Sequence, residues 1–253
     1  MIRQLQIEPL RAWTEAALGF FYPDACQICG DRKAGKADGY VCADCWARPD
    51  GVRFIKAPFC ELCGLPFRGD ITQAFECANC REMDLQFSHA RAAVVATGLL
   101  LDVIHRYKYK RALWFEPFLA DLLVRAAAPE LEVEPVDLLV PVPLHPLKEK
   151  EREFNQAARL AERLSRATGI PSDPHCVERI RDTDTQTLLS REDRARNMKR
   201  AFAALDSAAE LKGRRIALID DVLTTGATTS ACAKALRQAG AAEVMVWTVA
   251  RGL

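Results

Sequence analysis

Eight of the ten cysteines lie in four C-x-x-C pairs within residues 26–80. Two thiolates separated by two residues can turn back onto one ion, and two such pairs complete a tetrahedral zinc site with no position open to substrate. In a reducing compartment, where disulfides are rare, this spacing is typical of metal binding. The expected ligands are Cys26, Cys29, Cys42, Cys45, Cys60, Cys63, Cys77 and Cys80.

The four pairs form an internal repeat. Twelve residues separate the first two pairs and thirteen separate the last two, and a glycine follows both Cys29 and Cys63. Glycine suits the knuckle turn of such a ribbon because that turn often requires a positive φ. We therefore predict a double zinc ribbon with two structural zinc ions. The spacing favours ligation by consecutive pairs, and a cross-braced arrangement, with pairs one and three on one ion, is the alternative.

A second group of polar residues follows the apolar run at residues 216–219. Asp220 and Asp221 leave this run, and a loop rich in hydroxyl groups then leads into a helix-like segment. Backbone N–H groups at a helix start bind anions, and adjacent acids can hold sugar hydroxyls and a divalent cation. The pattern predicts a ribose 5-phosphate site with a divalent cation, and the Walker sequence is absent. The expected phosphate-binding residues are Thr224, Thr225, Gly226, Ala227 and Thr228.

Cations and amides elsewhere in the chain suit a pyrophosphate group. Arg152, Asn155 and Gln156 follow a strand-like segment and begin a helix, as a pyrophosphate-binding loop would. Lys108 lies in a basic and aromatic stretch that suits either pyrophosphate or single-stranded nucleic acid, or a helix end whose cations interact with the dipole. We expect the catalytic groups to be Lys108, Arg152, Asp220 and Asp221.

A polar stretch at residues 183–197 is a candidate lid over the substrate, and a solvated surface loop is the alternative. Its candidate ligand-binding residues are Thr183, Gln186, Arg191, Arg194 and Asn197, with Arg194 assigned to the phosphoribosyl ligand.

These groups need a scaffold, and from residue 89 onward the chain alternates strand-like and helix-like segments. Near-continuous apolar runs are typical of strands buried on both faces. The expected strands are 90–97, 136–143, 214–221 and 243–250, and the expected helices are 114–127, 156–168 and 228–239. This alternation predicts a parallel α/β sheet flanked by helices, with ligands bound beyond the carboxyl ends of the strands. We place an N-terminal helix and the ribbons in residues 1–88 and the α/β domain in residues 89–253.

Composition excludes several classes of protein. The 253 residues are 49% hydrophobic and 27% charged with a formal net charge of +1, which is unlike disordered, collagen-like or coiled-coil chains. Neither the long apolar run of a membrane helix nor that of a signal peptide is present, so we expect a cytoplasmic protein without membrane insertion. Residues 1–89 hold ten Lys and Arg against twelve Asp and Glu. Ribbons with this charge suit docking to protein, or to the rest of this chain, better than binding to DNA.

The residues 217–231, ALIDDVLTTGATTSA, resemble the phosphoribosyl pyrophosphate (PRPP) motif of type I phosphoribosyltransferases. Together with the cysteine pairs, the segments IHRYKYK, VPVPLHPLKEKEREFNQ and RIRDTDTQTLLSREDRARNMKRAF are similar to the ComF family of competence proteins over nearly the whole chain. The resemblance implies a double zinc ribbon before a phosphoribosyltransferase-like domain and a link to DNA uptake in natural transformation. It also implies that Asp220 and Asp221 contact the ribose hydroxyls while residues 224–228 surround the 5′-phosphate.

Two positions depart from the family pattern. Glu153 and Arg200 stand where the family commonly has glycine. A carboxylate at 153 is expected to repel pyrophosphate if the loop must approach it closely. The sequence therefore supports two functions, a Mg²⁺-dependent phosphoribosyltransferase of unknown acceptor or a non-catalytic DNA-uptake adaptor that binds PRPP and docks proteins through its ribbons. Candidate partners are PRPP or a related phosphoribosyl ligand, single-stranded DNA and DNA-uptake proteins.

Overall fold

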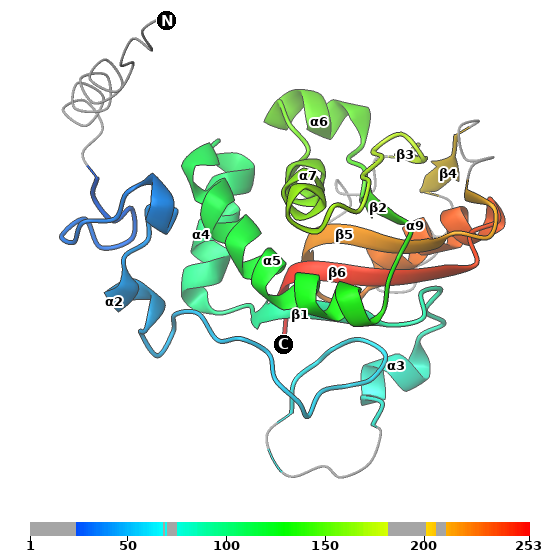
Figure 1. Ribbon diagram of the computed structural model, residues 1–253, viewed down its shortest axis with the longest axis horizontal. Helices are drawn as coiled ribbons and strands as arrows, with labels where there is room; N and C mark the ends of the chain where they lie inside the picture. Colours follow the sequence, from blue (N-terminus) through cyan, green and yellow to red (C-terminus); the bar gives the residue numbers. More distant parts are fainter. Residues whose placement is uncertain (1–23, 68, 70–74, 182–200, 206–210) are drawn as a thin grey trace, which may run out of the picture.

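The computed structural model describes residues 24–67, 69, 75–181, 201–205 and 211–253 (Figure 1). The expected N-terminal helix and Arg200 lie outside the described residues. So do the candidate lid residues Thr183, Gln186, Arg191, Arg194 and Asn197.

A four-stranded parallel sheet forms the centre of the molecule. Its strands are ordered β1 (Ala90–Val95), β6 (Glu243–Arg251), β5 (Arg215–Leu223) and β2 (Leu138–Pro141), and each neighbouring pair is parallel. The predicted parallel sheet flanked by helices is confirmed. Each strand begins and ends within two residues of its expected bounds.

Both faces of this sheet are buried. Along β5, Ile216 and Leu218 belong to one hydrophobic cluster, while Ala217 and Ile219 belong to the other. Because side chains of a strand alternate between faces, a strand covered on both sides needs an unbroken apolar run. This requirement explains why these strands can be predicted from apolar runs in the sequence.

Helices cover the two faces unequally. The helices α5 (Glu116–Val133) and α7 (Gln156–Thr168) pack on one face, and α9 (Ala227–Gln238) packs on the opposite face (Figure 1). The helix α4 (Gly98–Tyr109) joins the cluster of α5 and α7, and α6 (Pro146–Arg152) precedes α7. The structure thus adds α4 and α6 to the helices expected from sequence.

Shorter elements complete the described chain. A two-stranded antiparallel sheet pairs β3 (Val177–Arg179) with β4 (Phe202–Ala204). Single turns form η1 (Lys36–Asp38), α2 (Ala43–Trp46), α3 (Ala78–Glu82) and η2 (Leu113–Phe115). Among the described residues, no helix is both long and apolar enough to cross a membrane.

Both outer strands of the sheet make backbone contacts beyond it. At β1, Ile55 N donates to Ala93 O at 3.0 Å, and Val95 N donates to Arg53 O at 2.9 Å. At β2, Leu139 N donates to Pro171 O at 2.9 Å, and Asp173 N donates to Leu139 O at 3.0 Å. The linker between the two ribbons and the segment after α7 therefore each line one outer strand.

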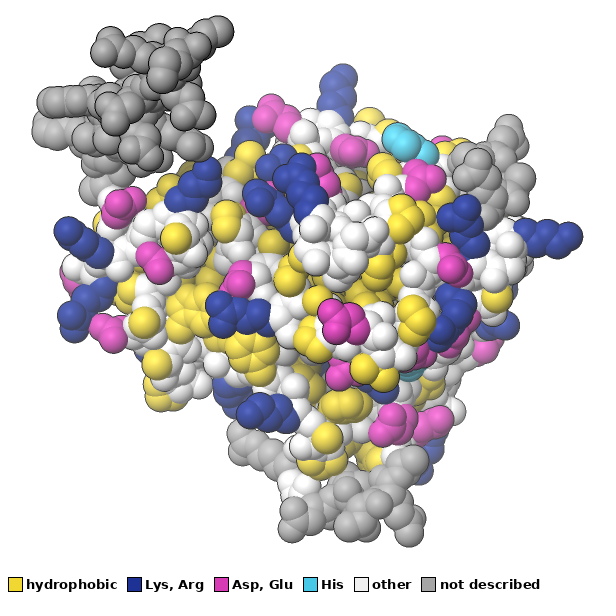
Figure 2. Space-filling view, viewed as in Figure 1, with side chains coloured by type: hydrophobic (Ala, Val, Ile, Leu, Met, Phe, Trp, Pro, Cys, Tyr) yellow, Lys and Arg dark blue, Asp and Glu magenta, His cyan; other side chains and the backbone are white. Residues whose placement is uncertain are grey.

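The first ribbon, residues 24–50, packs against α4 and α5. The rings of Trp46 and Phe118 meet edge to face with 4.8 Å between centroids, and Arg106 donates to Gln27 O at 2.8 Å. Beside this contact lies a hollow of about 600 Å³ whose walls include Trp46, Phe54 and Phe118. Figure 2 shows hydrophobic side chains gathered where the first ribbon meets α5.

The second ribbon, residues 59–82, packs beside β1 and the end of β6. Ala90 N donates to Leu62 O at 2.8 Å, and Arg91 donates to Glu61 O at 2.8 Å. Leu62 and Leu85 belong both to the hydrophobic cluster of this ribbon and to the cluster beneath α9. The two ribbons therefore dock on different parts of the α/β domain, as intramolecular docking requires.

Candidate ligand site and metal centres

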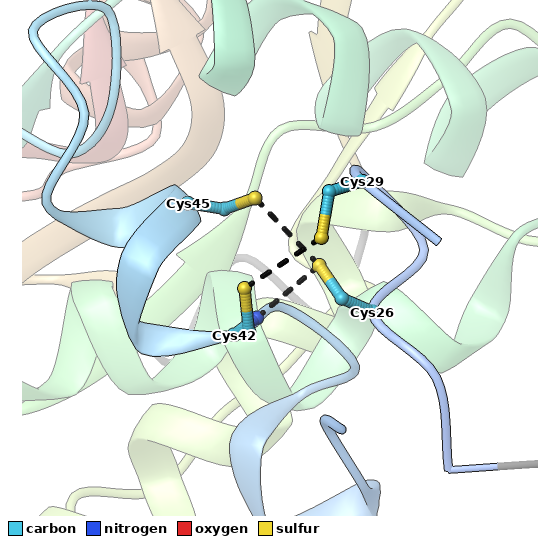
Figure 3. Close-up of side chains that lie close together, drawn as sticks. All are labelled: Cys26, Cys29, Cys42 and Cys45. Atoms are coloured by element: carbon cyan, nitrogen blue, oxygen red, sulfur yellow. Dashed lines mark hydrogen bonds between the residues drawn. The ribbon is translucent and has the colours of Figure 1, made fainter. Parts of the chain in front are cut away.

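The eight cysteines of the C-x-x-C pairs form two separate quartets. Cys26, Cys29, Cys42 and Cys45 make one, and Cys60, Cys63, Cys77 and Cys80 make the other, with all Sγ atoms of a quartet within 4.8 Å of one another. The consecutive pairing favoured by the spacing is confirmed, and the cross-braced alternative is wrong. Figure 3 shows the first quartet, in which Cys26 and Cys29 from one segment and Cys42 and Cys45 from the start of α2 point their thiols toward a common centre.

The spacing of the sulfur atoms fits zinc. The Sγ atoms of Cys26 and Cys45 lie 3.8 Å apart, and those of Cys29 and Cys42 lie 3.9 Å apart. A tetrahedral ion with Zn–S bonds of about 2.3 Å separates its ligands by about 3.8 Å. In the second quartet, Cys60 and Cys80 are 3.8 Å apart. Both quartets have the donors and the size of a structural zinc site.

Backbone hydrogen bonds prepare the first quartet for metal. Burial alone would raise the pKa of Cys26, but hydrogen bonds from the backbone N–H groups of Cys42, Cys29 and Ile28 outweigh it and lower this pKa to about 6. The Cys42 N–H contributes at 3.3 Å. Because the thiolate is the metal-binding form, these bonds favour ligation. Gly30 and Gly64, which follow the first knuckle of each ribbon, have φ of 76° and 65°, as the knuckle turn predicts.

The candidate ligand site is a cavity of about 580 Å³ at the carboxyl ends of β2 and β5. One wall is α4, and apolar side chains such as Leu101 and Leu144 line the cavity beside the polar groups. The sequence-predicted residues that it brings together are Lys108, Arg152, Gln156, Asp220, Asp221, Thr224 and Thr228. A smaller hollow of about 50 Å³ adjoins it and is lined by Asp220 and the whole loop Thr224–Thr228.

The loop 224–228 lies at the start of α9, as an anion site would. Gly226 is the N-cap residue, and the Thr225 hydroxyl accepts a hydrogen bond from Ala227 N at 3.3 Å. Thr224 and Thr225 are exposed, so a ligand can reach this part of the loop. Free N–H groups at a helix N-terminus carry a partial positive charge that favours phosphate. Loop and helix together supply the donors that the sequence indicates.

Lys108 and Asp221 form an ion pair at the floor of the cavity. Lys108 Nζ lies 2.7 Å from Asp221 Oδ2, and the side chains are 19% and 3% exposed. Burial alone would lower the pKa of Lys108, but the charges of Asp221 and Asp220 outweigh it and raise this pKa. The pair joins the last turn of α4 to the end of β5, which are far apart in sequence. It holds the cation beside the acidic strand end.

Asp220 has an unusual protonation state. Burial and then the charge of Asp221 raise its pKa to about 7, although Lys108 acts in the opposite direction. Its Oδ1 accepts a hydrogen bond from Asp221 N at 2.8 Å. Two adjacent carboxylates with one shared cation leave negative charge to be balanced, and oxygen donors of this kind suit Mg²⁺ that also contacts phosphate. The residues present fit the magnesium ion that the ligand would bring.

We expect Mg²⁺ binding at this site to strengthen with pH. Because the ligand-free pKa of Asp220 is about 7, the metal-binding ionised form is scarce at pH 6 and dominant at pH 8, which predicts about tenfold higher affinity at pH 8. Isothermal titration calorimetry in two buffers of different ionisation enthalpy should show proton release near pH 7. Asp220→Asn should remove that release. Equal affinity at the two pH values in wild-type protein would contradict the assignment.

Arg152 is held by a cluster of polar and aromatic groups. It donates from Nη1 to Gln156 Oε1 at 3.2 Å and from Nη2 to Tyr109 Oη at 3.1 Å, and its guanidinium lies 4.8 Å from the centre of the Tyr109 ring. The residue ends α6 and is 9% exposed. Tyr109 is a cavity residue to which the sequence analysis assigned no role.

Two other predicted residues differ in their placement. Asn155 is the N-cap of α7, where its Oδ1 accepts from Ala157 N and Ala158 N while its Nδ2 donates to Val142 O. It is not among the residues that line the cavity. Arg194 lies outside the described residues. The structure instead brings Arg179 of β3 to the cavity wall, a residue whose only sequence signal is its place at the start of the polar stretch RIRDTDTQ.

Glu153 is the C-cap residue after α6 and has φ of 66°, which is the left-handed region that favours glycine. This conformation explains a glycine in the family pattern at this position. The sequence predicts that the Glu153 carboxylate repels pyrophosphate. The placement of this side chain does not support the prediction, because the carboxylate lies 2.9 Å from the Arg111 guanidinium and is 61% exposed. Glu153 is also not among the residues that line the cavity.

The basic stretch around Lys108 is largely neutralised. Arg106 pairs with Asp102 at 2.8 Å, just as Lys108 pairs with Asp221 and Arg111 with Glu153. Single-stranded nucleic acid requires open positive charge beside exposed rings. The stretch therefore offers less charge to DNA than its sequence indicates, and DNA binding stays a prediction.

The parallel sheet flanked by helices and the two cysteine quartets define a class of protein, an α/β domain preceded by a double zinc ribbon. The double zinc ribbon domain family matches residues 17–83. Competence protein F of Haemophilus influenzae is 35% identical, with 77% of this chain and 85% of that protein covered. The chain belongs to the ComF family of competence proteins.

Two further proteins are similar to this chain. DNA utilization protein YhgH of Escherichia coli K12 is 32% identical, with 77% of this chain and 84% of that protein covered. Among solved structures, a purine phosphoribosyltransferase from Pyrococcus horikoshii aligns with a TM-score of 0.34 and 17% identity, over 53% of this chain and 82% of that one.

Proposed function

We propose that the protein binds PRPP with Mg²⁺ in the cavity beneath α4 and transfers its phosphoribosyl group to an acceptor. The observation that carries this proposal is the convergence of Lys108, Asp220 and Asp221 beside the loop 224–228 in one cavity. The acids alone, or the loop alone, would not indicate a sugar phosphate. Side by side in one cavity, the acids can bind a diol and a divalent cation while the loop binds a phosphate.

The roles of the residues follow from their charges. The loop at the start of α9 would hold the 5′-phosphate, and Asp220 and Asp221 would hold the ribose hydroxyls and the metal. Lys108 and Arg152 would bind the pyrophosphate end. In the transfer, the bond from the ribose C1 to pyrophosphate breaks, a bond from C1 to the acceptor forms, and the leaving group takes both bonding electrons. No side chain need act as a nucleophile, so catalysis rests on positioning and on stabilising the leaving anion.

We connect this chemistry to DNA uptake in natural transformation, because the relatives are a competence protein and a DNA utilization protein. A specific observation also favours the alternative of a non-catalytic adaptor. Lys108 is paired with Asp221, and Arg152 is bonded to Gln156 and Tyr109. These cations must exchange partners before they can bind a leaving group. A protein that binds PRPP without that exchange would act as a binding or sensing module whose zinc ribbons dock other proteins.

One experiment distinguishes the two functions. The purified protein is incubated with labelled PRPP, Mg²⁺ and a panel of nucleobases and amines. A phosphoribosyltransferase should release pyrophosphate in the presence of its acceptor. The adaptor should bind PRPP in equilibrium dialysis without releasing it. If PRPP neither binds nor turns over at millimolar concentration, the proposed function is wrong in both forms.

A further inference from the structure

Arg251, the last residue of β6, lies between the second zinc centre and the phosphate loop. Its Nε donates to Cys63 O at 2.9 Å, and its Nη2 lies 3.3 Å from Cys63 Sγ. Its Nη1 donates to Leu223 O at 3.2 Å and to Thr224 O at 2.8 Å, and also contacts Gly252 O. One planar guanidinium thus contacts a metal ligand on one side and the start of the candidate phosphate loop on the other.

The buried positive charge of Arg251 requires a negative partner, and four zinc-bound thiolates of the second quartet would provide it. The side chain is buried, at 4% exposure, and a buried guanidinium is costly without a negative partner. Among the residues that the structure describes, no carboxylate is recorded within ion-pair distance of Arg251, and its other acceptors are neutral carbonyls. Four thiolates around Zn²⁺ carry a net charge of −2. A zinc-loaded second quartet would therefore supply the countercharge through Cys63.

The segment that follows the second ribbon also contacts the loop and the start of α9. Leu85 and Phe87, which follow that ribbon in sequence, lie beside Gly226, where a Cβ atom would meet their side chains at 3.5 Å. Gln86 N donates to Ser230 Oγ at 3.0 Å in the first turns of α9. The loop therefore contacts both Arg251 and the segment 85–87. The position of the second ribbon affects both sets of contacts.

We propose that Arg251 is a positioning residue that couples the second zinc centre to the phosphate-binding loop. The zinc-loaded ribbon fixes the guanidinium, and the guanidinium fixes the carbonyls of Leu223 and Thr224, so that the loop amides are ordered before a ligand arrives. The effect on ligand affinity rests on the proposed function, but the effect on loop order does not. The second ribbon thereby forms part of the ligand site without touching the ligand.

The test compares Arg251→Gln with a matched control, Arg91→Gln. Arg91 also contacts this ribbon, through Glu61 at 2.8 Å and over the ring of Phe59, but the structure records no contact with the loop. Hydrogen–deuterium exchange of full-length, zinc-loaded protein should be faster in peptides covering residues 222–230 for Arg251→Gln and unchanged there for Arg91→Gln. Affinity for ribose 5-phosphate should fall about fivefold or more in the first variant alone. Both variants should keep close to two zinc ions per chain.

Each outcome decides a separate claim. Unchanged exchange of residues 222–230 in Arg251→Gln, or an equal increase in Arg91→Gln, overturns the coupling. Faster exchange with no binding of either ribose 5-phosphate or PRPP by wild-type protein keeps the coupling and removes the proposed function. If Arg251→Gln does not fold, Arg251→Lys serves in its place, because lysine retains the charge but cannot span the Cys63 and Thr224 contacts together. Exchange as slow as wild type in Arg251→Lys would then count against the proposal.

Discussion

Replacing both Asp220 and Asp221 by asparagine is expected to abolish PRPP binding. The change removes the two negative charges that would hold Mg²⁺ and the ribose diol while leaving side-chain size almost unchanged. We expect at least about a hundredfold loss of affinity, because each lost hydrogen bond to a charged group is worth about 1.5–3 kcal/mol. Isothermal titration calorimetry with PRPP and Mg²⁺ measures it. A matched control is Asp102→Asn, which neutralises an acid of α4 whose side chain pairs with Arg106.

The two single variants should differ in stability. Asp221→Asn leaves Lys108 buried without its carboxylate, and breaking a buried ion pair typically costs about 3–5 kcal/mol. Asp220→Asn, which removes a carboxyl whose pKa is already raised to about 7, should not lower the thermal midpoint at pH 7. Adding Lys108→Met to Asp221→Asn should recover stability without recovering binding. PRPP affinity within twofold of wild type in the double asparagine variant would eliminate the ribose site.

Loss of one cysteine of the second quartet is the other change with a large expected effect. Cys60→Ser should reduce the zinc content from two ions per chain to one and expose residues 59–82 to proteolysis. Structural zinc contributes an apparent 10–16 kcal/mol, roughly, to the folding of small zinc-finger peptides, which equals or exceeds the stability of a typical domain. Inductively coupled plasma mass spectrometry and limited proteolysis measure the two effects.

Cys176→Ser is the matched control for the zinc experiment. Cys176 is as buried as the ligands, but its thiol contacts Asp173 at 3.2 Å and belongs to neither quartet. It should keep both ions. Two zinc ions in Cys60→Ser, or freshly purified reduced wild-type protein that is folded with a zinc content near zero, would show that the quartets are not metal sites.

Local patterns in the sequence account for much of this fold. The helix α7 has the bounds expected from sequence, because Asn155 caps its start and Gly169, with φ of 76°, ends it. The strands are legible because both of their faces are buried. Of the helix α4, the sequence indicates only the end, as the alternative interpretation of the basic stretch around Lys108, and that alternative is confirmed. Leu99, Leu100, Val103, Ile104 and Tyr107 form a helical stripe of buried residues that would indicate the rest of the helix.

The candidate site likewise has parts that local sequence patterns predict and parts that they do not. The loop 224–228 and the C-x-x-C pairs are local in sequence, so their residue types and spacing indicate their chemistry. The ion pair of Lys108 with Asp221 and the contacts of Arg251 with Cys63 join residues that are 113 and 188 positions apart. No single-sequence pattern encodes such distances, since they arise from the order of the strands and from the docking of the ribbons. The motif predicted which residues matter, and the topology determines their partners.

The segments that line the two outer strands have a further consequence for solution behaviour. An open sheet ends in rows of N–H and C=O groups that can recruit a strand from another molecule, and this is a common start of aggregation. Here residues 53–55 occupy part of that row on β1, and residues 171–173 do so on β2. The linker that connects the two metal-binding ribbons therefore also limits the pairing of β1 with a strand of another molecule.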